Sequence, residues 1–223
     1  MIDQQFLEYL EGFVSDKRKA TFHKVLEQRT RHFTVVLEDI FQPHNSSAVV
    51  RTCDIFGVQD VHVIQNKYSS KVSRHVAKGS QKWLDINKYN KSATNTQDCL
   101  DDLRNNGYQI IATTPHNESC YLHDFDFTKK SAFVFGVEKE GVSDYIMNQA
   151  DGFLKIPMVG FTESLNISVA AAIILQEVTT KLRASNIPWQ LSDQEKALLY
   201  YQWVQKSIKS IRKISERYHL EKM

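Results

Sequence analysis

The sequence predicts an α/β fold in which a parallel sheet is flanked by helices. Between residues 34 and 183, short runs of β-branched and aromatic residues alternate with longer segments of helical periodicity. Such alternation is typical of parallel, doubly wound sheets, because a helix returns the chain to the same end of the sheet after each strand. The predicted strands lie at 34–37, 61–64, 108–112, 132–135 and 152–156.

Helices are predicted on both sides of this region. Residues 5–29 place apolar side chains three or four positions apart, with a break near 12–16, which predicts two short amphipathic helices. After Pro188 the chain is helical again, with one apolar stripe formed by Val204, Ile208, Ile211, Ile214 and Tyr218. The predicted parts are a helical extension at 1–33, an α/β domain at 34–183 and a basic helical extension at 184–223.

The charge is nearly balanced overall but not along the chain. The sequence has 28 Lys and Arg against 26 Asp and Glu, a net charge of +2. Residues 34–177 carry 13 basic and 17 acidic side chains, whereas residues 178–223 carry 9 basic and 4 acidic ones. The basic tail is either a solvated helix face or a surface that binds phosphates, and charge alone does not separate these readings.

Several classes of protein are excluded. The longest apolar run, 169–175, is far shorter than the roughly 20 residues of a membrane helix, and the first residues lack the apolar run of a signal peptide. A soluble, cytoplasmic protein is therefore expected. The three cysteines are widely spaced and the eight histidines form no His-x-x-x-His pair, so neither a disulfide framework nor a structural metal is expected.

The few glycines and prolines concentrate where strands are predicted to end. Of 8 Gly and 4 Pro, five lie between 136 and 160. The loop 136–143 follows a strand, its glycines let a ligand approach the backbone, and Ser143 can cap the next helix. A P-loop is excluded, because Val142 and Ser143 stand where that loop requires Lys and Ser or Thr, and no Gly-x-Gly-x-x-Gly occurs.

Two further loops carry polar residues. After the strand 152–156, Glu163, Ser164 and Asn166 precede a helix of small residues, and ordinary N-capping would account for only one of them. After the first strand, Asn45 begins a helix that carries Arg51. Arg51 alone reads as a surface charge. Its place near the carboxyl end of a parallel strand favours a functional role, because the three loops then lie at one edge of the sheet.

The three loops together resemble the SpoU/TrmH branch of the SPOUT methyltransferases, from about residue 15 to residue 183. The matching motifs are, in order, 45–52, 135–143 and 156–170. The segment 79–83 and the helical ends are similar to enzymes of this branch that 2′-O-methylate guanosine 18 in the tRNA D-loop. Relatives that methylate ribosomal RNA share the three motifs. The resemblance implies a deep trefoil knot at the end of the α/β domain, S-adenosylmethionine as cofactor, and a homodimer in which the partner subunit completes each active site.

The resemblance also assigns roles to residues. The positions that match cofactor contacts are Thr113, Gly136, Ile156 and Leu165. Those that match the catalytic set are Arg51, Asn45, Glu138, Ser164 and Asn166. We expect Ser164 and Asn166 to hold the substrate and the loop, Asn45 to orient Arg51, and Glu138 to support the second loop. Because a guanidinium keeps its proton, we favour phosphate binding and alkoxide stabilisation over general-base catalysis for Arg51, and the base stays unassigned.

Basic residues at the two ends become candidate contacts for RNA phosphates. They are Lys17, Arg18, Lys19, Lys24, Arg29, Arg31, Lys181, Arg183, Lys206, Lys209, Arg212 and Lys213. Similar tRNA enzymes carry two arginines after the third motif, whereas Lys181 and Arg183 stand at shifted positions. A tRNA 2′-O-methyltransferase is the favoured function. The alternatives are a ribosomal-RNA 2′-O-methyltransferase and a non-catalytic RNA-binding module, which the complete catalytic set disfavours.

Overall fold

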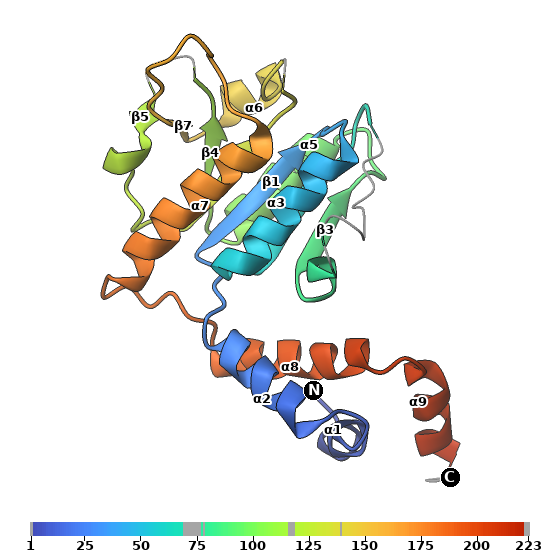
Figure 1. Cartoon of the computed structure of the whole chain (residues 1–223). Coiled ribbons are helices and arrows are strands. Elements are labelled where there is room, and N and C mark those ends of the chain that lie inside the picture. The colour runs from blue at the N-terminus through green and yellow to red at the C-terminus, as the bar shows by residue number, and fades with distance from the viewer. Residues whose placement is uncertain (1, 69–76, 78, 116–118, 139, 221–223) are drawn as a thin grey trace. The chain divides into compact units, whose positions relative to one another are not determined.

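The computed structural model describes residues 2–68, 77, 79–115, 119–138 and 140–220, and Lys139 of the second motif lies outside them (Figure 1). The chain divides into two compact units. One contains residues 30–189, and the other joins residues 1–29 with residues 190–223. The first unit is an α/β domain and the second is helical.

The α/β unit is built on a seven-stranded sheet whose neighbouring strands are all parallel, in the order β3-β2-β1-β6-β4-β7-β5. Its strands are β1 (Phe33–Glu38), β2 (Asp60–Ile64), β3 (Asp85–Tyr89), β4 (Gln109–Thr113), β5 (Cys120–Tyr121), β6 (Ser131–Phe135) and β7 (Gly152–Lys155). The predicted parallel α/β sheet is confirmed. The strands β3 and β5 were not predicted, because these sheet-edge strands are partly exposed and lack a buried apolar run.

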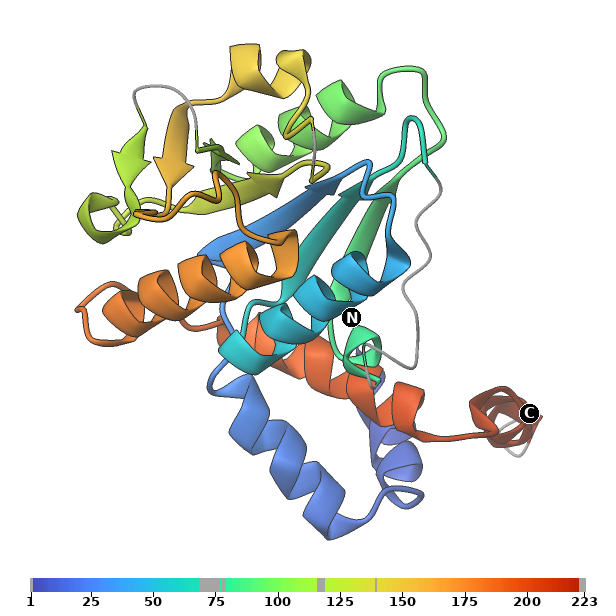
Figure 2. The ribbon, with the colours of Figure 1, turned by 45° about the horizontal axis from the view of Figure 1, so that its top comes forward.

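Helices cover both faces of the sheet, as Figures 1 and 2 show. On one face α3 (Pro43–Phe56) packs against α7 (Ile167–Arg183), and the other face holds α5 (Asn95–Asn105) and α6 (Asp144–Gln149). Strand residues alternate between the two cores: Val35 belongs to the first and Val36 to the second. Because β1 is buried along its whole length, every position of this strand packs against a neighbour.

The sheet topology brings three loops to one edge. Strand β1 pairs with β2 on one side and with β6 on the other. The chain segments that follow β1 and β6 therefore leave the sheet on opposite sides of the gap between these two strands. In such sheets ligands bind beyond the carboxyl ends of the strands, at the point where the strand order reverses. The loops after β1, β6 and β7 all begin at this edge. Two short 3₁₀ helices, η1 (Ser80–Lys82) and η2 (Leu122–Asp124), complete the unit.

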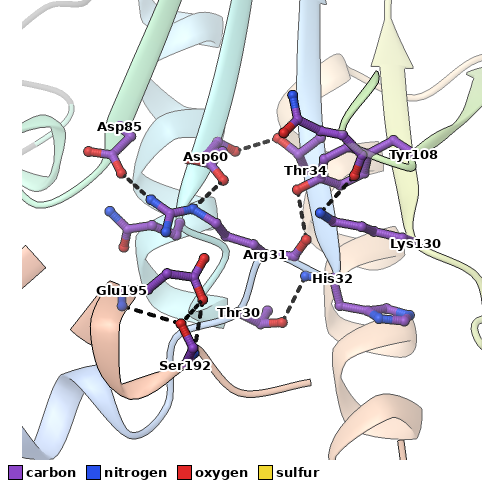
Figure 3. Close-up of polar contacts among 12 residues, drawn as sticks. Thr30, Arg31, His32, Thr34, Asp60, Asp85, Tyr108, Lys130, Ser192 and Glu195 are labelled. Atoms are coloured by element: carbon purple, nitrogen blue, oxygen red, sulfur yellow. Dashed lines mark hydrogen bonds and ion pairs between the residues drawn. The ribbon is translucent and has the colours of Figure 1, made fainter. Parts of the chain in front are cut away.

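At the amino-terminal ends of the strands lies a partly buried ion-pair cluster (Figure 3). The Arg31 side chain contacts Asp60 at 2.9 Å and Asp85 at 2.6 Å, which joins three parallel segments. Burial raises the pKa of the Asp60 carboxyl, and the positive charge of Arg31 opposes that shift. The hydroxyl of Tyr108 also donates to the Arg31 carbonyl oxygen at 2.7 Å. Arg31 therefore holds the amino-terminal ends of these segments together, and its expected contact with RNA stays a prediction.

The helical unit contains α1 (Gln4–Glu11), α2 (Asp16–Leu26), α8 (Asp193–Ser207) and α9 (Ile211–Leu220). Trp203 of α8 is buried against Phe22 of α2, with ring centroids 5.7 Å apart. A capping box between Ser192 and Glu195 starts α8 (Figure 3). The two short N-terminal helices are confirmed. The single C-terminal stripe was wrong, because Ile208 has an extended backbone that ends α8 and places the later stripe residues on a separate helix.

The described residues contain neither a helix suited to cross a membrane nor a cluster suited to hold a metal ion. None of their helices combines the length and the apolar composition needed to cross a bilayer. None of their His, Cys, Asp and Glu side chains gather in groups of three or more that could hold a metal ion.

Candidate functional site

A cavity of about 120 Å³ lies beyond the carboxyl ends of β4, β6 and β7. The loop after each of these strands contributes to its wall. The four expected cofactor positions, Thr113, Gly136, Ile156 and Leu165, all line it. The structure thus brings together residues that are up to 52 positions apart in the sequence.

The wall of this cavity is shaped by backbone that passes very close to Gly136. A Cβ atom on Gly136 would lie 1.9 Å from the carbonyl oxygen of Gly141. The loop between them closes with a hydrogen bond from the Gly141 amide to the Val137 carbonyl at 2.8 Å, and Gly141 has a φ of +73°. Only glycine fits at Gly136 without displacing this loop. The cavity is therefore a cradle in which a small ligand can approach the main chain.

Beside this cavity, three side chains from the three motifs form one hydrogen-bonded network. The Oε1 atom of Glu138 accepts from Nδ2 of Asn45 at 2.8 Å and from Nδ2 of Asn166 at 2.9 Å. Asn166 also donates to Oδ1 of Asn45 at 3.2 Å. Charge-assisted hydrogen bonds of this kind are stronger than neutral ones. The network fixes the relative positions of the loops that follow β1, β6 and β7.

Local structure explains two members of the network. Asn166 is the N-cap of α7, and its Oδ1 accepts from the Ser168 amide at 2.9 Å, as expected for a capping residue. Asn45 does not begin its helix, because Gln42 is the N-cap of α3 and Pro43 occupies the first turn. Asn45 is buried, so its amide must find partners inside the protein.

Arg51 and Ser164 lie apart from the network. Arg51 is exposed on α3, and Ser164 is exposed on the loop that lines the cavity. Asn45 donates to Gln42 and Glu138 and accepts from Asn166, and in the described residues no hydrogen bond joins it to Arg51. In the described residues Asn45 holds Glu138, and the orienting role expected for it toward Arg51 stays a prediction.

Glu38 and Asp39, which the sequence reading missed, hold the same edge of the sheet. Glu38 accepts from the amide and the hydroxyl of Ser143 at 2.8 and 2.7 Å, so it anchors the end of the second loop. Burial raises the pKa of the Glu38 carboxyl, and the Ser143 hydrogen bonds oppose that shift. Ser143 also caps α6, as predicted. The sequence did contain a sign of this role, because two acidic residues directly follow the predicted strand 34–37.

Seven of the twelve expected RNA contacts have exposed side chains. Exposed side chains are Lys17, Arg18, Lys24, Lys206, Lys209 and Lys213, together with Arg212, which pairs with Glu216 at 3.2 Å. Half-buried Lys19 pairs with Asp16 at 2.9 Å.

Three other expected RNA contacts have partners within the protein, and of these Arg29 is buried whereas Lys181 and Arg183 are partly exposed. Arg29 is 1% exposed, with its guanidinium over the Trp203 ring, which is inconsistent with a phosphate contact. Arg183 donates to the Phe56 carbonyl at 2.7 Å, and Lys181 donates to the His123 carbonyl at 2.7 Å. For these residues the basic side chain stabilises the fold near a helix end.

Comparisons with known proteins agree with this geometry. The model of the SpoU rRNA Methylase family matches residues 32–176. The tRNA (guanosine(18)-2′-O)-methyltransferase of Borreliella burgdorferi is 42% identical over 205 residues, which cover 91% of this chain and 92% of that protein.

Solved structures agree as well. The crystal structure of the Aquifex aeolicus TrmH/SpoU tRNA modifying enzyme superposes with a TM-score of 0.77 at 33% identity, covering 86% of this chain and 98% of that one. The SpoU methyltransferase AviRb from Streptomyces viridochromogenes, in complex with the cofactor AdoMet, gives a TM-score of 0.61 at 25% identity over 73% of this chain and 65% of that one. The chain therefore belongs to the SpoU rRNA methylase family.

Proposed function

We propose that this protein uses S-adenosylmethionine to methylate the 2′-oxygen of guanosine 18 in tRNA. The observation that carries the proposal is the 42% identity to the Borreliella burgdorferi enzyme over 91% of this chain. Similarity of that extent includes residues outside the family model, which ends at residue 176. It therefore supports the tRNA substrate as well as the chemistry.

The cavity around Gly136 fits S-adenosylmethionine. A cradle that a Cβ atom would fill suits a ligand held largely by backbone groups, and Thr113, Ile156 and Leu165 supply the rest of the wall. When bound there, the sulfonium of the cofactor supplies the methyl group. We assign these four residues to cofactor binding.

In the proposed reaction, the ribose 2′-oxygen would accept the methyl group that the cofactor supplies, and its proton would pass to the base that stays unassigned. The reaction needs close alignment of the oxygen, and the network of Asn45, Glu138 and Asn166 provides a rigid wall for it. Ser164 lines the cavity, and we assign it to contact with the ribose. These residues position the substrate, and Arg51 stabilises the developing alkoxide and the adjoining phosphate.

Arg51 acts, in this proposal, in the site of a partner subunit within a homodimer. Its side chain is exposed and lines neither the cofactor cavity nor the cavity beside the network. Large apolar side chains are exposed on the third-motif loop and on α7, among them Phe161, Val159, Val169 and Ile173. An exposed apolar surface of this kind is typical of a protein interface. We propose that it is the dimer surface.

We also propose that the loops after β6 and β7 form the trefoil knot implied by the resemblance. Both loops line the cofactor cavity together with the loop after β4, which supports this arrangement. The parts 1–33 and 184–223 are proposed as extensions that bind tRNA. The exposed lysines and arginines of α2, α8 and α9, and those between α8 and α9, support that role.

The test is methyl transfer from labelled S-adenosylmethionine to total tRNA and to ribosomal RNA, followed by mapping of the modified nucleotide. We expect 2′-O-methylguanosine at position 18 of tRNA. Modification of ribosomal RNA alone would favour the ribosomal alternative. RNA binding without any methyl transfer would favour a non-catalytic module.

A further inference from the structure

A second cavity, of about 220 Å³, adjoins the cofactor cavity. Gly136, Val137, Glu138 and Ile167 line both cavities, so the two are separated only by the first residues of the second-motif loop. Asn45 lines the second cavity from α3. If the ribose of a nucleotide contacts the network of Asn45, Glu138 and Asn166, its base needs a space that adjoins this network. The second cavity is such a space.

Two exposed aromatic rings form part of the wall of this cavity. Phe41 is 66% exposed and Tyr68 is 42% exposed, and their ring centroids are 5.1 Å apart at an interplanar angle of 71°. An edge-to-face pair leaves one ring face available for a further stacking partner. Neither ring belongs to the buried core of the protein, so the fold itself does not explain why they are there.

The Asp39 carboxylate holds the backbone that carries Tyr68. Asp39 stands two residues before Phe41, and its Oδ1 accepts from the amides of Asn66 at 2.7 Å, Lys67 at 2.9 Å and Tyr68 at 3.4 Å. The Asp39 amide in turn donates to the Ile64 carbonyl at 3.0 Å. Asp39 has a φ of +50°, a conformation that few residues other than glycine adopt without strain. Asp39 therefore fixes the backbone at Tyr68, and the ring of Tyr68 contacts that of Phe41.

We propose that Phe41 and Tyr68 form a stacking platform for the base of the nucleotide whose ribose is methylated. The proposal rests on the proposed function and adds a specificity-determining pair to it. Enzymes that act on a single nucleotide stack its base on aromatic side chains, which fixes the attached sugar. The pair touches no reacting atom and acts by positioning the ribose.

A larger cavity of about 610 Å³, which Tyr68 also lines, fits an RNA base less well. Its lining carries the carboxylates of Glu38, Asp39, Glu140 and Asp144 and one lysine, whereas the second cavity has the two carboxylates of Glu138 and Glu140. Repulsion of the phosphates that accompany a nucleotide is therefore stronger in the larger cavity. It does provide a matched control. Tyr145 lines this cavity, is 44% exposed, and does not line the cavity of Phe41.

The test measures single-turnover methyl transfer and S-adenosylmethionine affinity for Phe41→Ala, Tyr68→Ala, Phe41→Tyr and the control Tyr145→Ala. Base–aromatic stacking predicts that Phe41→Ala slows transfer about 10-fold or more, with Tyr68→Ala weaker in the same direction. Phe41→Tyr and Tyr145→Ala should remain near wild type. Cofactor affinity should stay unchanged throughout. If Phe41→Ala also loses cofactor affinity, Phe41→Leu replaces it, because leucine keeps the apolar bulk without an aromatic face.

A spectroscopic measurement separates stacking from a purely structural role. A tRNA with 2-aminopurine at the methylated position should lose fluorescence on binding to wild type and retain it on binding to Phe41→Ala. Equal transfer and equal quenching by Phe41→Ala and wild type would overturn the platform while leaving the proposed function intact. If wild type modifies only ribosomal RNA, the proposed substrate fails and the same variants are measured on that RNA. Absence of any transfer by wild type would overturn both.

Discussion

Nδ2 of Asn45 donates to Oε1 of Glu138 at 2.8 Å, across 93 residues of sequence. Asn45 belongs to the helix after β1 and Glu138 to the loop after β6, so one hydrogen bond joins the first two motifs. The bond has a neutral donor and a charged acceptor, which makes it sensitive to any exchange of charge between the two positions.

The first prediction exchanges that charge. Asn45→Asp places a second carboxylate beside Glu138, and repulsion should lower the single-turnover rate about 10- to 100-fold through misplacement of the loop. The double variant Asn45→Asp with Glu138→Gln restores an amide–carboxylate pair with the partners exchanged, and should recover part of the loss. A double variant as slow as the product of the two single effects would show that the residues act independently.

The second prediction concerns the close approach at Gly136. Gly136→Ala should destabilise the loop by about 1–3 kcal/mol, because its Cβ would overlap the Gly141 carbonyl, and should weaken S-adenosylmethionine binding. Calorimetric titration and urea unfolding measure the two effects. Gly160→Ala is the control, since nothing lies within 4 Å of a Cβ at that glycine. Equal stability and equal cofactor affinity of the two variants would contradict a cofactor site that depends on the close approach at Gly136.

The third prediction places Arg51 in the partner's site. Arg51→Ala and Asn166→Ala should each abolish transfer while retaining dimerisation. Mixed dimers of the two variants should regain activity, because one of the two sites then combines an intact Asn166 with an intact Arg51 from the other subunit. The check is co-expression with two different affinity tags and an assay of the doubly purified dimer. Inactive mixed dimers would place Arg51 in the site of its own subunit.

The fourth prediction follows from the raised pKa of Glu38. A carboxyl whose pKa is higher in the folded state than in the unfolded state contributes stability at low pH that is lost as pH rises through the folded pKa. Glu38→Gln keeps an acceptor for Ser143 and removes the buried charge. The free energy of unfolding of this variant relative to wild type should therefore increase between pH 4 and pH 7, as measured by urea denaturation. If the difference in unfolding free energy between variant and wild type did not change with pH, burial would not disfavour the charged form of Glu38.

The fifth prediction concerns the basic C-terminal surface. Replacing Lys206, Lys209 and Lys213 by alanine should weaken tRNA binding and reduce the slope of log affinity against log salt by about 2–3, if each lysine contacts a phosphate. A control triple variant at Lys88, Lys91 and Lys129 removes the same charge from exposed positions of the α/β unit. Equal slopes for the two triple variants would show that the lysines of the tail act only through the net charge of the protein.

The sequence determined those features that depend on local pattern. Apolar runs such as 132–135 could be predicted as strands, because parallel strands are apolar on both faces. Ser143 was identified as a cap because capping uses only nearby backbone groups. The three motif loops were located in the same way, with one correction, since Asn45 lies inside its helix rather than at its start.

Only the tertiary structure decided the partners of long polar side chains. Arg29 and Arg31 are both basic residues in a polar segment, yet one lies over Trp203 and the other between two aspartates. The edge strands β3 and β5 could not be predicted, because they are strands through their pairing with β2 and β7 and not through their composition. The contact of Asn45 with Glu138 could not be predicted for the same physical reason. A hydrogen bond between distant residues depends on how strands are ordered in the sheet, and no local pattern records that order.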